Sequence, residues 1–537
     1  MRFRSALLAA LVSGAGLILG SSSASAAVQP AGCSTIFDVP GADCGTLTVP
    51  LDRSGAVPGK VKLFFERDRV TGGEKNATIA VFPGGPGAAT TVYGGSFLHD
   101  FGKRRAKHDL LLLDQRGTGR SGYLNCDVAL TPTYFAPPGE DAHTLGKTVE
   151  RCAKRLGARR GFYTTRETVA DLEDVRAALG IDKFILYGIS YGTRDAMAYA
   201  QAYPEHVERM VLDSSVSETG IDPFGLSSVR ALPRVLSQMC RGGGCAGITN
   251  DPGADLTTLV KRLESGAVRA RQPVTLMGCR LRPAITRTRI YSMLQQVDED
   301  PELLSQLPVA LAHAAQGRPF ELSTLVASQS DYLNFCALVK ILKRLIPQKG
   351  IKDDLQLLRT SFSIGEQTAR LCEESALPWP RDSIPSQRQN MAERALSGYG
   401  DAAFSPLDRA TVQAASLIPM CKFWIAANSE PPSGPTPLPA VPTLIVSGLD
   451  DLRTPVEDAA ALAATSPTAR LLRVPDVGHS VIESSGCARR GLGHFLKDEP
   501  ISECHVYPQH SPKPAKRVPS LQEQLENLLK RLPKPAQ

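Results

Sequence analysis

The sequence predicts an α/β protein: a doubly wound, mostly parallel β-sheet that is interrupted by a large helical insertion. Short apolar runs alternate with amphipathic helical patterns from about residue 60 to residue 213, as expected for βαβ units. The pattern is mostly helical over residues 220–430, and two further strand-like runs follow. An insertion entered and left at neighbouring points of one sheet explains both observations, and it would cover the strand ends where such sheets bind ligands.

Each element of this sheet is predicted from a local pattern. Two of the strands, 77–82 and 108–114, are apolar enough to be buried inside a parallel sheet. Residues 164–180 have helical spacing, with Thr164 or Thr165 as the N-cap and Gly180 at the end of the helix. The predicted strands are 60–70, 77–82, 108–114, 183–188, 209–213, 443–448 and 469–475. The predicted helices are 164–180, 191–204 and, within the insertion, most clearly 302–317 and 331–346.

The two ends of the chain differ from the predicted folded body. Arg2 and Arg4 precede an apolar stretch and the small residues 24–26, which is the pattern of a secretory signal peptide. This stretch is too short and too interrupted by glycine for a membrane span. We therefore predict a secreted or periplasmic protein. Its predicted segments are a signal peptide (1–26), a first core part (27–219), a helical cap (220–430), a second core part (431–504) and a Pro/Lys-rich tail with a short amphipathic helix (505–537).

Composition narrows the possible partners. The chain has 537 residues, of which 42% are hydrophobic and 21% charged, as in soluble globular proteins. The formal net charge of +7 is spread thinly, with Lys/Arg clusters at 103–107, at 341–344 and in the tail. Because no basic stripe is interleaved with aromatic residues, we expect no nucleic-acid partner. We also expect no stable membrane insertion, because no segment after the predicted signal peptide could span a bilayer.

The twelve cysteines all follow the predicted signal peptide. An even number in an exported chain favours structural disulfides. With no C-x-x-C motif and no Cys/His cluster of ligand spacing, we expect no metal site. Short separations predict the disulfides Cys33–Cys44, Cys126–Cys152, Cys240–Cys245 and Cys487–Cys504, and they leave Cys279, Cys336, Cys372 and Cys421 unassigned.

A candidate nucleophile lies in "YGISYGT" (187–193), where Ser190 stands between two glycines directly after a predicted strand. A serine hydroxyl needs a histidine to accept its proton, and the histidine needs a carboxylate to orient it. Asp451 in "IVSGLDDLRTP" and His479 in "VPDVGHS" each follow a later predicted strand. The chain order Ser, Asp, His is that of α/β-hydrolases.

Both later positions have rivals. Asp451 is favoured over Asp450 because it stands three residues after the strand-ending Gly448, and Asp450 would then cap the turn. His494 lies in an apolar helical stretch, and His505 has no strand to present it. The prediction for the base therefore remains His479.

An oxyanion hole requires two backbone N–H groups that point at the developing charge. Tyr191, directly after the nucleophile, would supply one of them. The loop "FPGGPGAAT" (82–90) follows an early strand, and its glycines allow close approach to a carbonyl oxygen. Gly84 or Gly85 is therefore the expected second donor.

Five motifs together resemble the proline iminopeptidase/tripeptidyl aminopeptidase family of α/β-hydrolases (peptidase family S33), and most closely its secreted bacterial tripeptidyl aminopeptidases. They are "GGPG", "DQRGTGRSG", "YGISYGT" with "AYAQAYPEHV", "GLDDLRTP" and "VGHS". The resemblance covers about residues 33–504 and implies a triad of Ser190, Asp451 and His479, an oxyanion loop at 84–87 and a helical cap over the substrate. Pro83 and residues 88–90 depart from the family pattern, which leaves the shape of the first subsite open.

An aminopeptidase must also bind a cationic α-amine, for which buried carboxylates are suited. Glu373 and Glu374 in "RLCEESALPW" are the candidates, although both could instead be structural or solvated. The acidic run 298–300 is interpreted as a solvated helix start, and Arg116 in "DQRG" as a structural brace.

The predicted function is a secreted serine exopeptidase that releases tripeptides, or single residues such as proline, from peptides with a free N-terminus. No cofactor is expected, and the oligomeric state stays open. An esterase or amidase with the same triad is the alternative, and a catalytically silent binding protein a remote one. A dehalogenase or epoxide hydrolase would have an aspartate at position 190.

Overall fold

The computed structural model describes residues 27–33, 39, 41–70, 77–105, 107–126, 138–241, 244–266, 268, 274–276, 279–281, 284–328, 356–357, 360–427 and 437–505. The predicted signal peptide, the predicted helix at 331–346 and the tail beyond residue 505 lie outside this part. Among the described residues, no helix has the length and apolar character needed to cross a bilayer.

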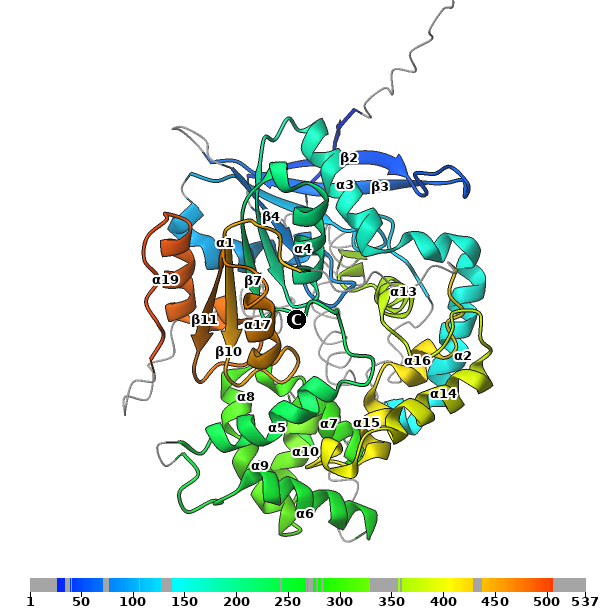
Figure 1. Cartoon of the computed structure of the whole chain (residues 1–537), viewed down its shortest axis with the longest axis vertical. Helices are drawn as coiled ribbons and strands as arrows, with labels where there is room; N and C mark the ends of the chain where they lie inside the picture. The colour runs from blue at the N-terminus through cyan, green and yellow to red at the C-terminus, as the bar shows by residue number, and fades with distance from the viewer. Residues whose placement is uncertain are drawn as a thin grey trace, which may run out of the picture.

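A nine-stranded sheet forms the centre of the molecule, with the order β1-β2-β3-β5-β4-β6-β7-β10-β11 (Figure 1). Its strands are β1 (Gln29–Pro30), β2 (Asp43–Pro50), β3 (Lys60–Asp68), β4 (Thr78–Phe82), β5 (Leu110–Asp114), β6 (Phe184–Ile189), β7 (Val207–Asp213), β10 (Thr443–Gly448) and β11 (Ala469–Val474). From β5 to β11 all neighbours pair in parallel, whereas β1, β2 and β3 add an antiparallel edge. The predicted fold class is confirmed.

All seven predicted strands are present, with boundaries within two residues of the prediction. The first two strands were not predicted. The segment that forms β2, "DCGTLTVP", mixes polar residues with a glycine and a proline, and its burial alternates only in its second half. It is an outer strand of the sheet, where a strong apolar pattern is not required.

Helices cover both faces of the sheet. They are α1 (Gly94–Phe101), α3 (Thr165–Ala178), α4 (Gly192–Ala202), α17 (Val456–Ala463), α18 (Val481–Ser484) and α19 (Gly486–Phe495). Successive residues of β4 face opposite sides: Ile79 and Val81 pack in the cluster that includes α1 and α19, and Ala80 and Phe82 in the cluster that includes α3 and α4. The α3 helix begins as predicted, because the Thr164 side chain accepts a hydrogen bond from the Glu167 N–H.

Between β7 and β10 the chain forms a group of helices, which lies below and to the right of the sheet in Figure 1. These helices are α5 (Leu226–Gln238), α6 (Pro252–Glu264), α7 (Arg287–Leu294), α8 (Pro301–Ser305), α9 (Leu307–Ala315), α10 (Phe320–Ser328), α13 (Ile364–Glu374), α14 (Pro385–Ser397), α15 (Arg409–Ala415) and α16 (Ile418–Cys421). Helix α2 (Pro138–Leu156), from the connection between β5 and β6, packs against α15 and α16. We call these helices the cap.

The predicted helix at 302–317 is in fact two helices, α8 and α9. Pro308 falls in the first turn of α9, where a proline is tolerated because its missing N–H would have no helical partner. Asp300 caps α8 by accepting hydrogen bonds from the N–H groups of Glu302 and Leu303.

All four predicted disulfides are present, and a fifth joins Cys372 to Cys421 inside the cap. This last pair is separated by 49 residues, too many for the short-spacing argument to detect.

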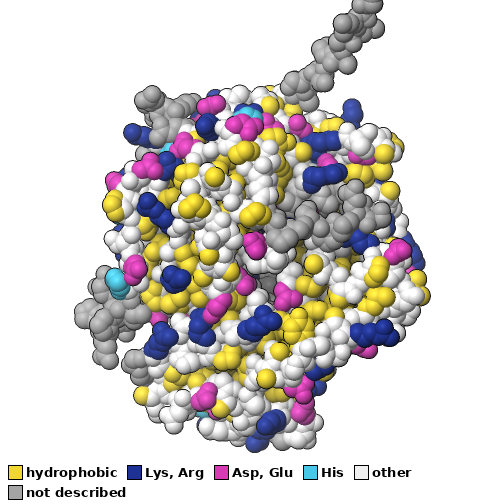
Figure 2. Space-filling model, viewed as in Figure 1, with side chains coloured by type: hydrophobic (Ala, Val, Ile, Leu, Met, Phe, Trp, Pro, Cys, Tyr) yellow, Lys and Arg dark blue, Asp and Glu magenta, His cyan; other side chains and the backbone are white. Residues whose placement is uncertain are grey.

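On the face of the molecule in Figure 2, acidic and basic side chains are interspersed rather than gathered by sign.

Candidate active site

Ser190 lies on a sharp turn between β6 and α4. Its φ of 54° is in the left-handed region, which costs a non-glycine residue about 1–3 kcal/mol and occurs mainly at functional sites. The flanking glycines are required by close contacts: a Cβ at Gly188 would lie 2.6 Å from the Gly192 carbonyl oxygen, and one at Gly192 would lie 2.2 Å from the Phe82 oxygen. The turn is the strand-to-helix elbow that G-x-S-x-G predicts.

Asp451 and His479 meet beyond the carboxyl ends of β10 and β11. His479 Nδ1 is 2.9 Å from Asp451 Oδ2, and both side chains are almost fully buried. The Asp451 carboxylate also accepts hydrogen bonds from the Arg453 N–H (2.9 Å), the Thr454 N–H (2.8 Å) and the Thr454 hydroxyl (2.8 Å). These donors fix the carboxylate, so its second oxygen is directed at the imidazole.

The electrostatics of this pair suit a general base. Burial opposes charge on both groups, but the His479 cation and the hydrogen bonds from His479 and Thr454 still lower the pKa of Asp451 below its usual value. Burial likewise disfavours the imidazolium, yet the Asp451 carboxylate outweighs it and raises the pKa of His479 above 6.5. Each partner therefore favours the charged form of the other.

The serine turn and the segment after His479 both form hydrogen bonds with Asp213, at the end of β7. The Ser190 N–H donates to the Asp213 carbonyl oxygen (2.9 Å), and the Asp213 carboxylate accepts from the N–H groups of Val481 and Ile482 (2.9 Å each). Within the described residues, no hydrogen bond joins the Ser190 hydroxyl to His479. In ligand-free enzymes such a bond is often long and tightens only with substrate.

The loop 84–90 lies directly against the candidate nucleophile. A Cβ at Gly84 would be 3.0 Å from Ser190 Cβ and 3.5 Å from Ser190 Oγ. In the described part of the chain, the backbone N–H groups of Gly84, Gly85 and Tyr191 donate to no other protein group. Unpaired donors beside a serine hydroxyl are what an oxyanion hole requires.

The residues that depart from the family pattern anchor this loop. The Thr90 hydroxyl donates to the Leu113 carbonyl oxygen (2.6 Å), and the Ala89 N–H donates to the Ser361 oxygen (2.8 Å). Ser363 returns a hydrogen bond to the Gly87 oxygen (2.7 Å). The cap segment 361–363 therefore supports the loop from outside.

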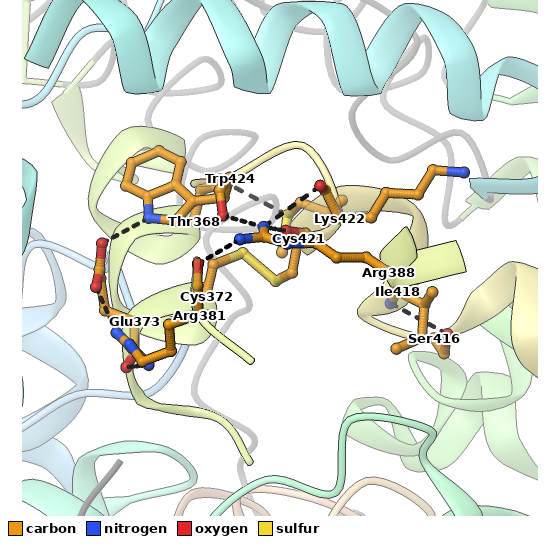
Figure 3. The surroundings of a disulfide bond; sticks show 11 residues. Thr368, Cys372, Glu373, Arg381, Arg388, Ser416, Ile418, Cys421, Lys422 and Trp424 are labelled. Carbon is orange, nitrogen blue, oxygen red and sulfur yellow. Dashed lines mark hydrogen bonds and ion pairs between the residues drawn. A yellow bond between two sulfur atoms is a disulfide. The ribbon is translucent and has the colours of Figure 1, made fainter. Parts of the chain in front are cut away.

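Glu373 belongs to the interior of the cap. Its carboxylate accepts hydrogen bonds from Trp424 Nε1 and the Ala427 N–H (2.9 Å each) and pairs with Arg381 at 2.6 Å. Figure 3 shows this cluster beside the Cys372–Cys421 disulfide. Because its oxygens and its charge are both occupied, Glu373 is not available for a substrate amine.

Glu374 points instead toward the serine turn. Its carboxylate accepts from the hydroxyls of Tyr191 (2.6 Å) and Thr165 (2.9 Å) and from the Thr165 N–H (2.5 Å). Two cations lie farther away, with Arg370 Nε at 3.8 Å and Arg194 Nε at 4.0 Å. Of the two glutamates, only this one reaches the residue that follows the nucleophile.

Asp298 was predicted to be solvated, and this is wrong. The residue is 1% exposed and lies beside the His479–Asp451 pair, although it belongs to the cap. No local signal could reveal this, because the contact joins residues more than 150 positions apart in the sequence.

The rival residues have other roles. The Asp450 N–H donates to the Val477 oxygen, and burial raises the pKa of its carboxyl to about 7. His494 pairs with Glu499 near the surface, and His505 is the last described residue. Arg116 is fully buried and bonds to Asp171 and to backbone oxygens, so it is the predicted brace.

Asp298, Asp451 and His479 also carry atoms of metal-ligand type within 4.8 Å of one another. Their oxygens are already engaged, however, by backbone N–H groups, by Thr454 and by the Arg453 guanidinium, whose Nε lies 3.2 Å from Asp298. A cation at this position would compete with Arg453. The arrangement fits an acid–base pair with a second carboxylate beside it better than a metal centre.

Comparisons with known proteins agree with this geometry. The family model for the alpha/beta hydrolase fold matches residues 78–233, and that for TAP-like proteins matches residues 406–507. The tripeptidyl aminopeptidase of Streptomyces lividans is 30% identical over 189 residues, 32% of this chain and 35% of that protein. The serine protease Hip1 of Mycobacterium tuberculosis is 34% identical over 198 residues, 34% of this chain and 38% of that protein.

The proline iminopeptidase of Neisseria gonorrhoeae is 30% identical over 142 residues, 26% of this chain and 34% of that protein. The matched segments thus span little more than a third of these relatives. A solved proline iminopeptidase from Mycobacterium smegmatis aligns over 84% of this chain and 98% of its own, at 14% identity and a TM-score of 0.33, which is too weak a likeness to support an argument. On its sheet topology and its family-model matches, the chain has the α/β-hydrolase fold, and its sequence is similar to tripeptidyl aminopeptidases and proline iminopeptidases.

Proposed function

We propose that the protein is an exported serine exopeptidase that releases tripeptides, or single residues such as proline, from free peptide N-termini. The observation that carries this proposal is the hydrogen-bonded His479–Asp451 pair at the same sheet edge as Ser190 in its left-handed turn. The peptidase relatives favour peptides as substrates. The disulfides favour an oxidising compartment outside the cytosol.

The proposed reaction is acyl transfer in two steps. His479 Nε2 takes the proton of the Ser190 hydroxyl as its oxygen attacks the scissile carbonyl carbon, while Asp451 stabilises the imidazolium. The negative oxygen of the tetrahedral intermediate accepts hydrogen bonds from the N–H groups of Tyr191 and of Gly84 or Gly85. His479 then protonates the leaving amine, and water repeats the sequence to release the N-terminal fragment.

Recognition of the substrate's α-amine is assigned to Glu374. Its side chain is 13% exposed, and its carboxylate accepts a hydrogen bond from the hydroxyl of Tyr191, the residue that follows the nucleophile in the chain. A cationic amine would add a charge-assisted hydrogen bond at this carboxylate. Glu373 has no part in this proposal.

An esterase or amidase acting on small molecules is the second candidate, and a specific observation favours it. Arg370 and Arg194 already face Glu374, and Arg370 is fully buried. If these cations compensate the carboxylate, little attraction remains for a substrate amine. Such an enzyme would use the same triad without a requirement for a free N-terminus.

The deciding experiment compares chromogenic amides of Ala, Pro and Ala-Pro-Ala with their N-acetylated forms, alongside p-nitrophenyl acetate. An exopeptidase cleaves the free-amine peptides and not the acetylated ones. In Glu374→Gln, kcat/KM for free-amine substrates should fall about 10- to 100-fold, with hydrolysis of the ester much less affected. Equal rates on free and acetylated substrates would refute the exopeptidase and support the esterase.

Ser190→Ala is the control for the chemistry itself. It should abolish both hydrolysis and labelling by a fluorophosphonate probe, since both require the serine oxygen. Persistent turnover in this variant would show that Ser190 is not the nucleophile.

A further inference from the structure

A single turn of the cap contacts both loops that carry the His479–Asp451 pair. The turn is η6 (Val297–Glu299), between α7 and α8. The backbone carbonyl of Asp298 accepts a hydrogen bond from the His479 N–H (3.0 Å). Its side-chain carboxylate accepts from the Leu452 N–H (3.0 Å) and from Arg453 Nε (3.2 Å). One residue thus holds the histidine with its backbone and the acid loop with its side chain.

The histidine loop is shaped for this contact. A Cβ at Gly478 would lie 2.2 Å from the Asp298 carbonyl oxygen and 2.7 Å from Asp298 Cβ, so only glycine permits the approach. Arg453 secures the other side, since Nη2 donates to the Gln296 oxygen (3.2 Å) and Nη1 pairs with Glu299 (2.5 Å). The fit between cap turn and catalytic loops is therefore close from both directions.

From this geometry we propose that Asp298 is a positioning residue for His479, through which docking of the cap completes the catalytic triad. The inference rests on the proposed serine-hydrolase chemistry and adds a cap residue to it. It implies that the acid–base pair reaches its working geometry only when η6 is seated.

The Asp298 carboxylate pairs with Arg453 Nε at 3.2 Å and is also the second carboxylate beside the His479 imidazole. A carboxylate that is 1% exposed and near Asp451 pays for desolvation and for like-charge repulsion, which a neutral asparagine would avoid. The charged and titratable groups around Asp298 are Asp451 and Arg453 from the acid loop, His479 from the base loop and Glu299 from its own turn. During catalysis His479 becomes a cation, and Asp298 is then a second anion near it.

The titration behaviour is consistent with this role. Burial, with the nearby Asp451, raises the pKa of Asp298 to about 7, despite the opposing effect of Arg453. Asp298 is in turn one of the groups that raise the pKa of His479. The protonation states of Asp298 and His479 therefore influence each other.

The test measures the rate at which a fluorophosphonate labels Ser190 between pH 5 and pH 9, which requires no knowledge of the natural substrate. For Asp298→Asn we expect the plateau rate to fall about 10- to 100-fold. We also expect the acid limb of the pH–rate profile, where the labelling rate falls as His479 is protonated, to move to lower pH by roughly half a unit to one unit. The reason is that loss of the anion makes the imidazolium less stable. A residue that only stabilised the fold would not move the limb.

Arg453→Lys separates charge from geometry. It keeps the cation but loses the forked donors, so the rate should fall while the acid limb stays in place. Asp300→Asn is the matched control: it makes the same chemical change two residues away, keeps an N-cap for α8, and should label as the wild type does.

If Asp298→Asn is folded and labels at the wild-type rate with the same limb, the inference is wrong. If that variant does not fold, wild-type labelling of Arg453→Lys overturns it. A wild-type protein that is not labelled at all would instead contradict the proposed function, so the two failures are distinguishable.

Discussion

Replacement of Glu366 by glutamine should make the protein more stable at alkaline pH. Glu366 is fully buried in α13, and its Oε2 has no hydrogen-bond partner within the described part of the chain. Burial, together with Asp195 and Glu374, raises the pKa of its carboxyl from 4.5 to about 8, although Arg370 opposes the shift. At neutral pH the folded protein therefore favours the protonated, uncharged form, which glutamine mimics.

The sign and size of the effect follow from linkage. Between pH 4.5 and pH 8 the unfolded chain has released this proton while the folded protein keeps it, so the free energy of unfolding decreases as pH rises through that range. At ~1.4 kcal/mol per pH unit the loss is at most about 5 kcal/mol. We expect roughly half of this, because the ionised carboxylate can move closer to Arg370, whose Nη1 is 3.5 Å from Oε1.

The assay is urea unfolding of wild type and Glu366→Gln at pH 4, 6 and 9, with the disulfides intact. The variant should resemble the wild type at about pH 4, where the carboxyl is protonated in both the folded and the unfolded chain, and exceed its stability by about 2–3 kcal/mol at pH 9. The control is Glu457→Gln, at a glutamate paired with Arg234 near the surface, for which the pH dependence should match the wild type. A Glu366→Gln variant that is less stable at pH 9 would show that the carboxylate is ionised and stabilising, and would refute the reasoning.

Two further predictions concern the active site. Gly84→Ala places a Cβ 3.0 Å from Ser190 Cβ and 3.5 Å from Ser190 Oγ, so fluorophosphonate labelling should slow by roughly 100-fold at an almost unchanged melting temperature. An unchanged labelling rate would show that the serine turn accommodates the methyl group, and would contradict the close fit of this loop to the nucleophile. Thr454→Val removes a hydroxyl that donates to Asp451 Oδ2 at 2.8 Å, so kcat/KM should fall about tenfold. The control Thr454→Ser keeps the donor and should keep most of the activity. Equal kcat/KM for the wild type, Thr454→Val and Thr454→Ser would contradict this role.

Local sequence patterns were sufficient for the sheet and for the elements that carry the triad. The runs that became β4, β5 and β10 are apolar because they are buried along their whole length, so their pattern is visible without any partner. The serine turn is similarly self-contained, since its glycines are required by contacts within or next to the motif. Chain order and strand ends then bring Asp451 to His479, because neighbouring parallel strands end at the same edge of the sheet.

The residues that the cap contributes to the site could not be predicted from local sequence patterns. Two adjacent glutamates in one helix have the same local sequence, yet Glu373 faces Trp424 and Arg381 while Glu374 faces Tyr191. Asp298 has the local pattern of an exposed helix start, and its burial depends on loops more than 150 residues away. The reason is physical: strand and turn patterns record short-range constraints, whereas the partner of a buried charge is selected by distant segments that meet only when the cap packs on the sheet. The sequence alone determined the fold class and the chemistry of the candidate triad, and only the tertiary structure decided which cap carboxylates reach it.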